Sequence, residues 1–313
     1  MFSTKTGAAK LLIVVVTGLI AIKILVGWLT GSISILAQAA DSFFDLFAGL
    51  ITFSAIRIAT KPADSEHPYG HGKVEDIAGM IQGALIFIAG VIIIYTSIIR
   101  IIEGAVIEVA EAGIAVMVIS IIVSILLSRH LLKVAKATDS TAIEANAQNI
   151  SSDVYSAVAV LVGLVIVKLT GLNLIDSAIA IAVALYIIKI SYDTIRKPVA
   201  ALLDSRLPHT QESAIRDCVN NHIHEVVGFH ALRTRRAGSQ RYVDLHLVMS
   251  KEISLEQAHQ ICDQIETEIA KILPESSVVI HAEPCSDECL QCDVICSKRG
   301  KNKADGKRTS RPR

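Results

Sequence analysis

Six long apolar runs occupy the first two thirds of the chain, with short polar segments between them. Each run is close to the roughly 20 residues that an α-helix needs to cross a bilayer. We therefore predict a bundle of six transmembrane helices within residues 1–205. The runs fall at residues 11–31, 33–57, 77–100, 112–132, 142–170 and 174–194.

Positive charge is concentrated in every second loop of this predicted bundle. Arg57, Lys61 and Lys73 lie between the second and third runs, whereas the next loop, EGAVIEVAEAG, has no Lys or Arg. Such an excess of Lys and Arg is typical of cytoplasmic loops. We therefore predict a multi-pass protein of the cell (inner) membrane with both termini in the cytoplasm.

After about Pro208 the pattern becomes that of a soluble domain, which we place at residues 206–284. The stretches HTQESAIRDCVNNHI and SLEQAHQICDQIETEIAKIL have helical periodicity, and Ser254 with Gln257 forms a capping-box sequence in the second. Three further stretches, GFHALRTRRA, QRYVDLHLVMS and SSVVIHAEP, have the pattern of strands. The order α-β-β-α-β predicts a cytoplasmic α+β domain with a ferredoxin- or metallochaperone-like fold.

The composition favours a membrane protein over an ordinary soluble one. Hydrophobic residues make up 52% of the 313 residues, and the formal net charge is 0. The lipid bilayer is therefore an expected partner, and nucleic acid is not. Residues 285–313, which end in a strongly basic block, are predicted to be a disordered tail; attraction to anionic lipid is the alternative interpretation of that block.

Acidic and amide side chains interrupt the second and fifth apolar runs. Asp41 and Asp45 are four residues apart and share a helix face, as do Asn149 and Asp153. With a rise of about 1.5 Å per residue in antiparallel helices, Asp41 is level with Asp153, and Asp45 with Asn149. Four oxygen-bearing side chains are thus predicted to meet near mid-membrane.

Three carboxylates so close together would repel one another unless a cation joins them. With a divalent cation, these acids and Asn149 would form a four-ligand oxygen cage. The alternative is that they are neutral polar groups that hold helices together. Two matched pairs at matched depth favour a metal site in a translocation path.

The loop between the second and third runs, PADSEHPYGHG, offers a second set of metal ligands. Asp64, His67 and His71 are a plausible ligand set, and Gly70 and Gly72 permit a tight turn between them. Taken alone, this loop fits better with solvated surface histidines.

Together these motifs resemble the cation diffusion facilitator family. The resemblance rests on D-x-x-x-D in the second run, x-x-x-D in the fifth and PADSEHPYGHGKVE between runs, and extends from about residue 8 to residue 284. It implies a homodimeric exporter of divalent metal cations that works as a metal/proton antiporter. We therefore expect a secondary active transporter rather than an enzyme, with no cofactor and with Mn²⁺, Fe²⁺ or Zn²⁺ as substrate and regulatory ligand.

The resemblance also assigns roles outside the membrane. The loop set Asp64, His67 and His71 matches the family's cytoplasmic loop site, and Lys73 and Asp204 match a charge interlock between the two protomers. Glu283 stands where the family usually has Asp, and His222 and His224 are expected to be surface residues. The regulatory metal ligands implied in the soluble domain are His230, His246, His259, His281 and Glu283.

Asn149 departs from the pattern of the zinc-transporting members, which usually carry His at this position. An amide oxygen makes the cage all-oxygen, which favours hard ions, Mn²⁺ first and Fe²⁺ next, over Zn²⁺. The resemblance to manganese exporters, which share this Asn, agrees. A zinc exporter of the same family and a membrane-anchored metal sensor without transport remain alternatives.

Two other classes of membrane protein fit less well. A cage with three acids in each protomer would bind a cation too tightly for a channel to conduct. An intramembrane aspartyl enzyme would need two acids without an amide partner, and no G-x-G-D element is present in the sequence.

A cysteine cluster follows the soluble domain, with the spacing C-x₃-C-x₂-C-x₃-C. In a reducing cytoplasm it favours an accessory metal site over a disulfide framework. Its members are Cys285, Cys289, Cys292 and Cys296.

Overall fold

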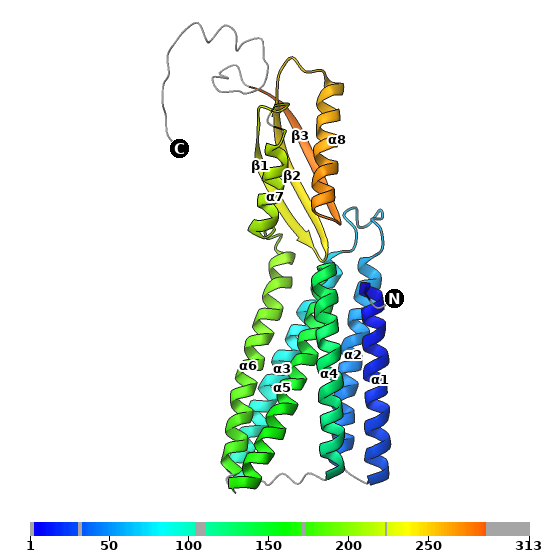
Figure 1. Cartoon of the computed structure of the whole chain (residues 1–313), viewed down its shortest axis with the longest axis vertical. Helices are drawn as coiled ribbons and strands as arrows, with labels where there is room; N and C mark the ends of the chain where they lie inside the picture. Colours follow the sequence, from blue (N-terminus) through cyan, green and yellow to red (C-terminus); the bar gives the residue numbers. More distant parts are fainter. Residues whose placement is uncertain (1–2, 31–32, 104–110, 171–172, 223, 286–313) are drawn as a thin grey trace, which may run out of the picture. The chain divides into compact units, whose positions relative to one another are not determined.

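A computed structural model describes residues 3–30, 33–103, 111–170, 173–222 and 224–285. The chain divides into two compact units, Met1–Leu203 and Asp204–Arg313 (Figure 1). Within the described residues the first unit is entirely helical and the second combines helices with a sheet.

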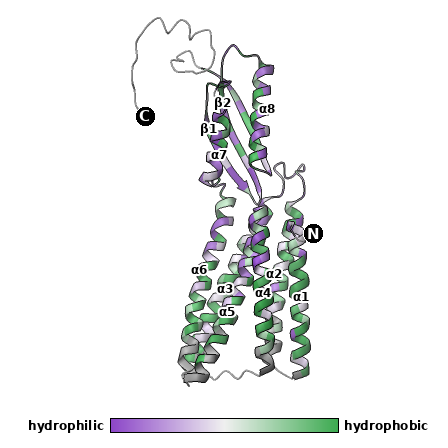
Figure 2. Ribbon diagram, viewed as in Figure 1, coloured by the Kyte–Doolittle hydropathy of each residue, from purple (hydrophilic) through white to green (hydrophobic). Residues whose placement is uncertain are grey.

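The first unit contains six long helices. Five of them are long and apolar enough to cross a membrane within the described residues. The helix without such a stretch is α5, whose first half carries polar and acidic residues from Glu144 to Asp153. Hydrophobic residues are frequent along the described parts of these helices (Figure 2). The helices are α1 (Lys5–Thr30), α2 (Ile33–Ala59), α3 (Lys73–Glu103), α4 (Glu111–Thr138), α5 (Thr141–Thr170) and α6 (Asn173–Leu202).

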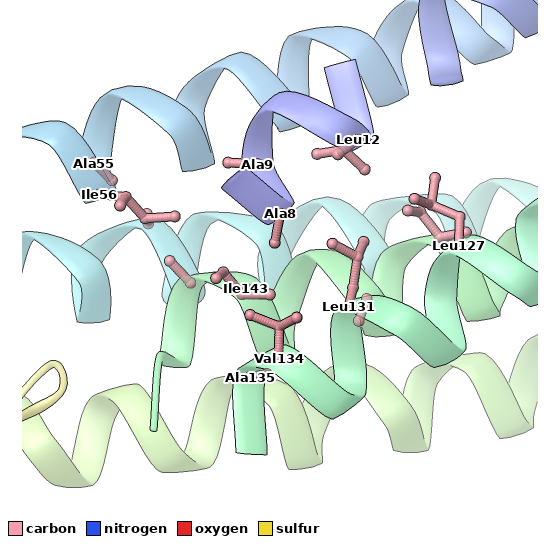
Figure 3. Close-up of a cluster of buried hydrophobic side chains, with 14 of the residues drawn as sticks. Ala8, Ala9, Leu12, Ala55, Ile56, Leu127, Leu131, Val134, Ala135 and Ile143 are labelled. Atoms are coloured by element: carbon pink, nitrogen blue, oxygen red, sulfur yellow. The ribbon is translucent and has the colours of Figure 1, made fainter. Parts of the chain in front are cut away.

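Small side chains let the helices of this bundle approach closely. Ala8 and Ala9 of α1 are buried beside Ile56 of α2 and Leu131 of α4 (Figure 3). Because lipid is as apolar as these side chains, close packing rather than the hydrophobic effect holds such helices together.

Gly83 makes the close contact between α3 and α6 possible. A Cβ atom at this position would lie 2.4 Å from Cγ1 of Ile195 and 3.3 Å from the Ile195 backbone nitrogen. A larger residue would fit there only if the Ile195 side chain or α6 itself shifted, so the glycine permits the close approach of the two helices.

The second unit has the predicted order α-β-β-α-β. Its three strands form one sheet in the order β1-β2-β3, with β1 antiparallel and β3 parallel to β2. Ser254 and Gln257 make both hydrogen bonds of the predicted capping box. The elements are α7 (His209–Asn220), β1 (Gly228–Ala237), β2 (Gln240–Met249), α8 (Leu255–Ile272) and β3 (Ser276–Pro284).

The core of this unit lies between the two helices and one face of the sheet. Leu245 and Leu247 of β2 are buried against Ile215 of α7 and Ile265 of α8. Because side chains alternate along a strand, His246 between these leucines points to the opposite, more exposed face. The burial of each such aliphatic side chain contributes about 1.5–3 kcal/mol. The hydrophobic pattern therefore dictates which face carries the histidines.

Candidate functional site

The bundle brings together two of the four predicted membrane ligands. Nδ2 of Asn149 on α5 donates a hydrogen bond to Oδ1 of Asp45 on α2 at 3.1 Å, and both side chains are half-buried. Asp153 lies one turn further along the same face of α5, with an exposed side chain. Asp41 lies on α2, one turn before Asp45, but its side chain is outside the described part of the chain.

A second polar layer, which the sequence did not reveal, adjoins this pair. Oγ1 of Thr52 accepts hydrogen bonds from Nε2 of Gln82 at 3.2 Å and from Nδ2 of Asn146 at 3.1 Å. The three residues come from α2, α3 and α5, and all are buried. The sequence did contain a signal for two of them. Thr52 lies seven residues after Asp45, and Asn146 lies three before Asn149, so each shares a helix face with a predicted metal ligand.

Two acids at the start of α3 are also buried, which the sequence did not indicate. Glu75 is 1% exposed. Its carboxylate accepts hydrogen bonds from Nζ of Lys5 at 3.2 Å and from Oγ of Ser140 at 2.6 Å. Asp76 accepts a hydrogen bond from Oγ1 of Thr141 at 2.9 Å. These contacts connect the start of α3 to α1 and to the start of α5. Acids are common in the first turn of helices, so Glu75 and Asp76 differ from ordinary first-turn acids only in being buried.

The loop between α2 and α3 brings Asp64, His67 and His71 together. Nδ1 of His67 lies 3.3 Å from Oδ1 of Asp64, and Nε2 of His71 lies 3.4 Å from Oδ2. One ligand atom from each residue lies within 4.8 Å of the others, a separation that one metal ion can bridge. Gly70, with φ of 77°, provides the predicted tight turn.

The carboxyl group of Asp64 is held in its charged form. The backbone N–H of His67 donates to Oδ1 at 2.7 Å, and this bond chiefly lowers the pKa of Asp64 below its ordinary value. Nδ1 of His71 is buried without a hydrogen-bond partner among the described residues. The loop therefore offers an anionic oxygen and two imidazoles, a ligand set suited to a divalent transition metal.

The sheet of the second unit aligns three of the predicted histidines. His230 pairs with His246 across β1 and β2, and His246 pairs with His281 across β2 and β3. The ring centroids lie 5.1 Å and 5.0 Å apart along this row. Glu283 joins them, with Oε2 at 2.9 Å from Nε2 of His230 and Oε1 at 2.7 Å from Nδ1 of His246.

A bulge in β1 places His230 on the histidine face. The register shifts between His230 and Arg233, where two residues of β1 stand opposite one of β2. Ala231 adopts a φ of 52° within the bulge. In a regular strand His230 and Arg233, three residues apart, would point to opposite faces because side chains alternate. The bulge lets both pair with residues on one face of β2, His246 and Asp244.

Glu283 is the charged centre of this cluster. Hydrogen bonds from His246 and then from His230 lower the pKa of Glu283. Ligand atoms of His230, His246 and Glu283 all lie within 4.8 Å of one another. His281 is more distant, with Nε2 at 3.8 Å from Oε1 of Glu283.

Other predicted positions lie apart from this cluster. Nε2 of His259 on α8 lies 3.5 Å from Oδ2 of Asp263, and His259 belongs to neither metal-sized group of described residues. Asp204 accepts a hydrogen bond from Nη1 of Arg235 at 3.3 Å within the second unit, and Lys73 begins α3 in the first.

The prediction that His222 is a surface residue is wrong. Its ring is buried, with Nε2 at 3.0 Å from Oε2 of Glu268 and Nδ1 at 2.9 Å from Oε2 of Glu225. It lies between the end of α7 and α8, a position that the sequence of the connecting turn could not reveal. His224 is exposed as expected.

Only the first residue of the cysteine cluster is described. Cys285 is buried, and its backbone N–H donates to the carbonyl of Met249 at 2.8 Å. Cys289, Cys292 and Cys296 lie outside the described residues.

Comparison with known protein families accounts for both units. The cation efflux transmembrane domain matches residues 9–203, and the cytoplasmic domain of cation efflux proteins matches residues 207–285. The chain belongs to the cation efflux, or cation diffusion facilitator, family. It is thus a membrane transporter for divalent cations, as its motifs predict.

Curated relatives cover most of this cation efflux protein. It is 36% identical over 273 residues to the cation-efflux pump FieF of Salmonella paratyphi A, a match that spans 86% of this chain and 89% of the relative. An uncharacterized transporter of Synechocystis, sll1263, is 32% identical over 259 residues, spanning 83% and 84%. A solved structure of the Zn form of CzrB, 32% identical, covers 27% of this chain and 97% of its own, with a TM-score of 0.26.

Proposed function

We propose that this cation efflux protein exports divalent metal from the cytoplasm in exchange for protons. The proposal is carried by the hydrogen bond between Asn149 and Asp45, with Asp153 one turn along the same face of α5. Together with Asp41, these side chains would supply an oxygen cage for the transported cation. Intramembrane acids are costly, at about 2.5–3.5 kcal/mol each by insertion measurements, and typically mark an ion path.

Proton exchange follows from the chemistry of the cage. Without metal, carboxylates this close together are driven to take up protons, and the metal must displace those protons to bind. A cation leaving Asp41, Asp45 and Asp153 is therefore replaced by protons. Alternating exposure of the cage to the two sides of the membrane turns this exchange into antiport.

Mn²⁺, with Fe²⁺ next, is the preferred substrate in this proposal. Asn149 contributes an amide rather than an imidazole, so the cage lacks the nitrogen ligand from which Zn²⁺ gains most. A zinc exporter of the same family is the alternative, and the ratio of Mn²⁺ to Zn²⁺ flux decides between them.

The proposed assembly is a homodimer in the cell (inner) membrane with both termini in the cytoplasm. Helix α5 would be the sixth spanning helix, its polar half covered by neighbouring helices and the cation path. Asp64, His67 and His71 would recruit cations at the loop, and Lys73 and Asp204 would form the charge interlock between protomers.

Metal bound by the soluble domain would regulate this dimer. His230, His246 and Glu283 already lie within metal-binding distance of one another, and His281 and His259 would complete two sites near the dimer face. The same cluster is the specific observation that favours a second candidate, a membrane-anchored metal sensor without transport.

Flux in liposomes separates these candidates. The purified protein is reconstituted, and uptake of Mn²⁺, Fe²⁺, Co²⁺ and Zn²⁺ is followed with and without an acidic lumen. The proposal predicts saturable uptake that the proton gradient accelerates, with Mn²⁺ ahead of Zn²⁺. Metal binding without uptake of any ion would favour the sensor instead.

A further inference from the structure

One buried oxygen in the bundle has no hydrogen-bond partner and no role in the proposed cage. It is Oε1 of Gln82, on a side chain that is 0% exposed. Among the described residues of α1 to α6, no other buried side-chain nitrogen or oxygen lacks a hydrogen-bond partner. A buried acceptor left unsatisfied costs about 1–3 kcal/mol, so native proteins retain few without a reason.

The rest of the Gln82 amide is firmly held. Nε2 donates to the carbonyl oxygen of Ala48 at 2.7 Å and to Oγ1 of Thr52 at 3.2 Å. Oγ1 of Thr52 also accepts a hydrogen bond from Nδ2 of Asn146 at 3.1 Å. Thr52 and Asn146 are 1% and 2% exposed. These bonds fix the amide plane, and Oε1 is the group that remains available to a ligand.

The position of this layer relates it to the cage. Ala48 and Thr52 follow Asp45 by three and seven residues, and Asn146 precedes Asn149 by three, so each lies on the face of its helix that carries the cage residue. The layer continues the polar stripe toward the end of the bundle where α2 ends. The loop with Asp64, His67 and His71 begins at that same end. A cation that moves along the stripe between loop and cage passes Gln82.

We propose that Gln82 is a transit ligand, whose Oε1 coordinates the divalent cation on its way between the loop end of the bundle and the Asp45–Asn149 pair. This inference rests on the proposed function. An amide oxygen is a hard ligand without charge, so it replaces part of the hydration shell of a hard cation. Without a carboxylate it does not trap the ion, and passage requires binding weak enough for the ion to leave.

The test uses the full-length protein in liposomes and two substitutions of the same residue. Gln82→Met keeps an unbranched side chain of similar size but removes the whole amide, the Nε2 donor included. Gln82→Glu keeps the shape but adds a charge. Gln148→Met is the matched control. It makes the same chemical change in α5, two residues from Asn146 and therefore on the opposite face of the helix. Three properties are measured: the Mn²⁺ dependence of initial flux, equilibrium Mn²⁺ binding by electron paramagnetic resonance, and the melting temperature.

A transit ligand affects the rate and not the occupancy of the cage. Gln82→Met should lower the maximal flux by about tenfold or more, the effect of a barrier raised by one lost ligand. Its Mn²⁺ binding should stay within about twofold of the parent. Its melting temperature should fall below that of Gln148→Met, because the buried hydrogen bonds of Nε2 to Ala48 and Thr52 are lost as well. Gln82→Glu should lower both KM and maximal flux, because a charged ligand retains the cation.

Three results would overturn the inference. Gln82→Met could transport as well as Gln148→Met, or its Mn²⁺ binding could fall together with its flux, which would make Gln82 a residue that supports the structure of the cage. Equal KM and maximal Mn²⁺ flux in Gln82→Glu and the parent would mean that Oε1 does not contact the cation. If the parent itself moved no divalent cation, the proposed function would fail first, and the liposome experiment on the parent alone reveals this.

Discussion

Nδ2 of Asn149 donates to Oδ1 of Asp45 at 3.1 Å, which joins two helices whose contacting residues are 104 positions apart in sequence. The pairing matches the depths calculated from helix rise alone, in which these two residues share one level and Asp41 and Asp153 share the next. A carboxylate and an amide in contact inside an apolar bundle form the beginning of an oxygen site for a cation.

Removing Asp153 should abolish metal transport and leave the dimer folded. Asp153→Ala eliminates a carboxylate that we assign to the cage, whereas its exposed side chain contributes little to packing within the chain. Flux in liposomes measures the loss, and size-exclusion chromatography checks the assembly. Asp41→Ala should give the same result. Normal flux in either variant would remove that residue from the cage.

Exchanging Asn149 for His should shift the transporter toward zinc. An imidazole nitrogen benefits Zn²⁺ more than Mn²⁺, so Asn149→His should raise the ratio of Zn²⁺ to Mn²⁺ flux. It also adds a group that titrates near neutrality, which should make flux more sensitive to pH between about 6 and 7. Because the ratio is measured on one preparation, differences in expression cancel. An unchanged ratio would contradict the role of Asn149 as selector.

Loss of the histidine row should abolish the response of the soluble domains to metal. In the parent, metal bound by His230, His246 and His281 would stabilise the closed arrangement of the two protomers, since only that arrangement completes the sites. The triple variant with Gln at these positions should show no metal-dependent change in distance between spin labels on the two domains. If its distances still respond to metal as in the parent, the regulatory role is wrong.

A methyl group at Gly83 should destabilise the membrane unit. Gly83→Ala places Cβ 2.4 Å from Cγ1 of Ile195, so the Ile195 side chain or α6 must shift, at a cost of about 1–3 kcal/mol. Gly18→Ala is the control, because no atom lies within 4 Å of a Cβ at that position of α1. Thermal unfolding in detergent should separate the two variants. Equal melting temperatures would show that α3 and α6 do not need this close approach.

The stability of the second unit should fall as the pH rises above neutrality. Burial alone would lower the pKa of His222, but its hydrogen bonds to Glu268 and Glu225 outweigh this and raise it. The stabilisation is complete below the ordinary histidine pKa of about 6.5 and is lost as the pH passes the raised value. His222→Gln should therefore remove part of the decrease in melting temperature between pH 6 and pH 8.5, whereas His224→Gln, at an exposed site, should not.

The elements of this protein were largely predictable because each has a strong periodic pattern. The apolar runs located the long helices of the first unit, and the pattern in QRYVDLHLVMS located the strand that carries His246. The bulge at Ala231 was not predictable, since nothing in GFHALRTRRA marks an extra residue. It nevertheless decides that His230 faces His246.

The candidate site was predictable only where charge made it conspicuous. Asp45 and Asn149 stand out because acids and amides are rare in an apolar run. Gln82 and Thr52 did not, because a single neutral polar residue in a helix is common and gains significance only from its neighbours on other helices. For the same reason the burial of Glu75 and His222 became evident only from the tertiary structure.

The central claim is that the Asp45–Asn149 pair holds the exported cation. Mn²⁺ uptake driven by an imposed proton gradient tests this claim most directly. Parent protein and Asp45→Ala are reconstituted at equal density, and Mn²⁺ uptake is compared with an acidic and with a neutral lumen. We predict that the acidic lumen accelerates uptake by the parent and that Asp45→Ala shows neither uptake nor acceleration. Gradient-driven Mn²⁺ uptake by Asp45→Ala at the rate of the parent would contradict the claim.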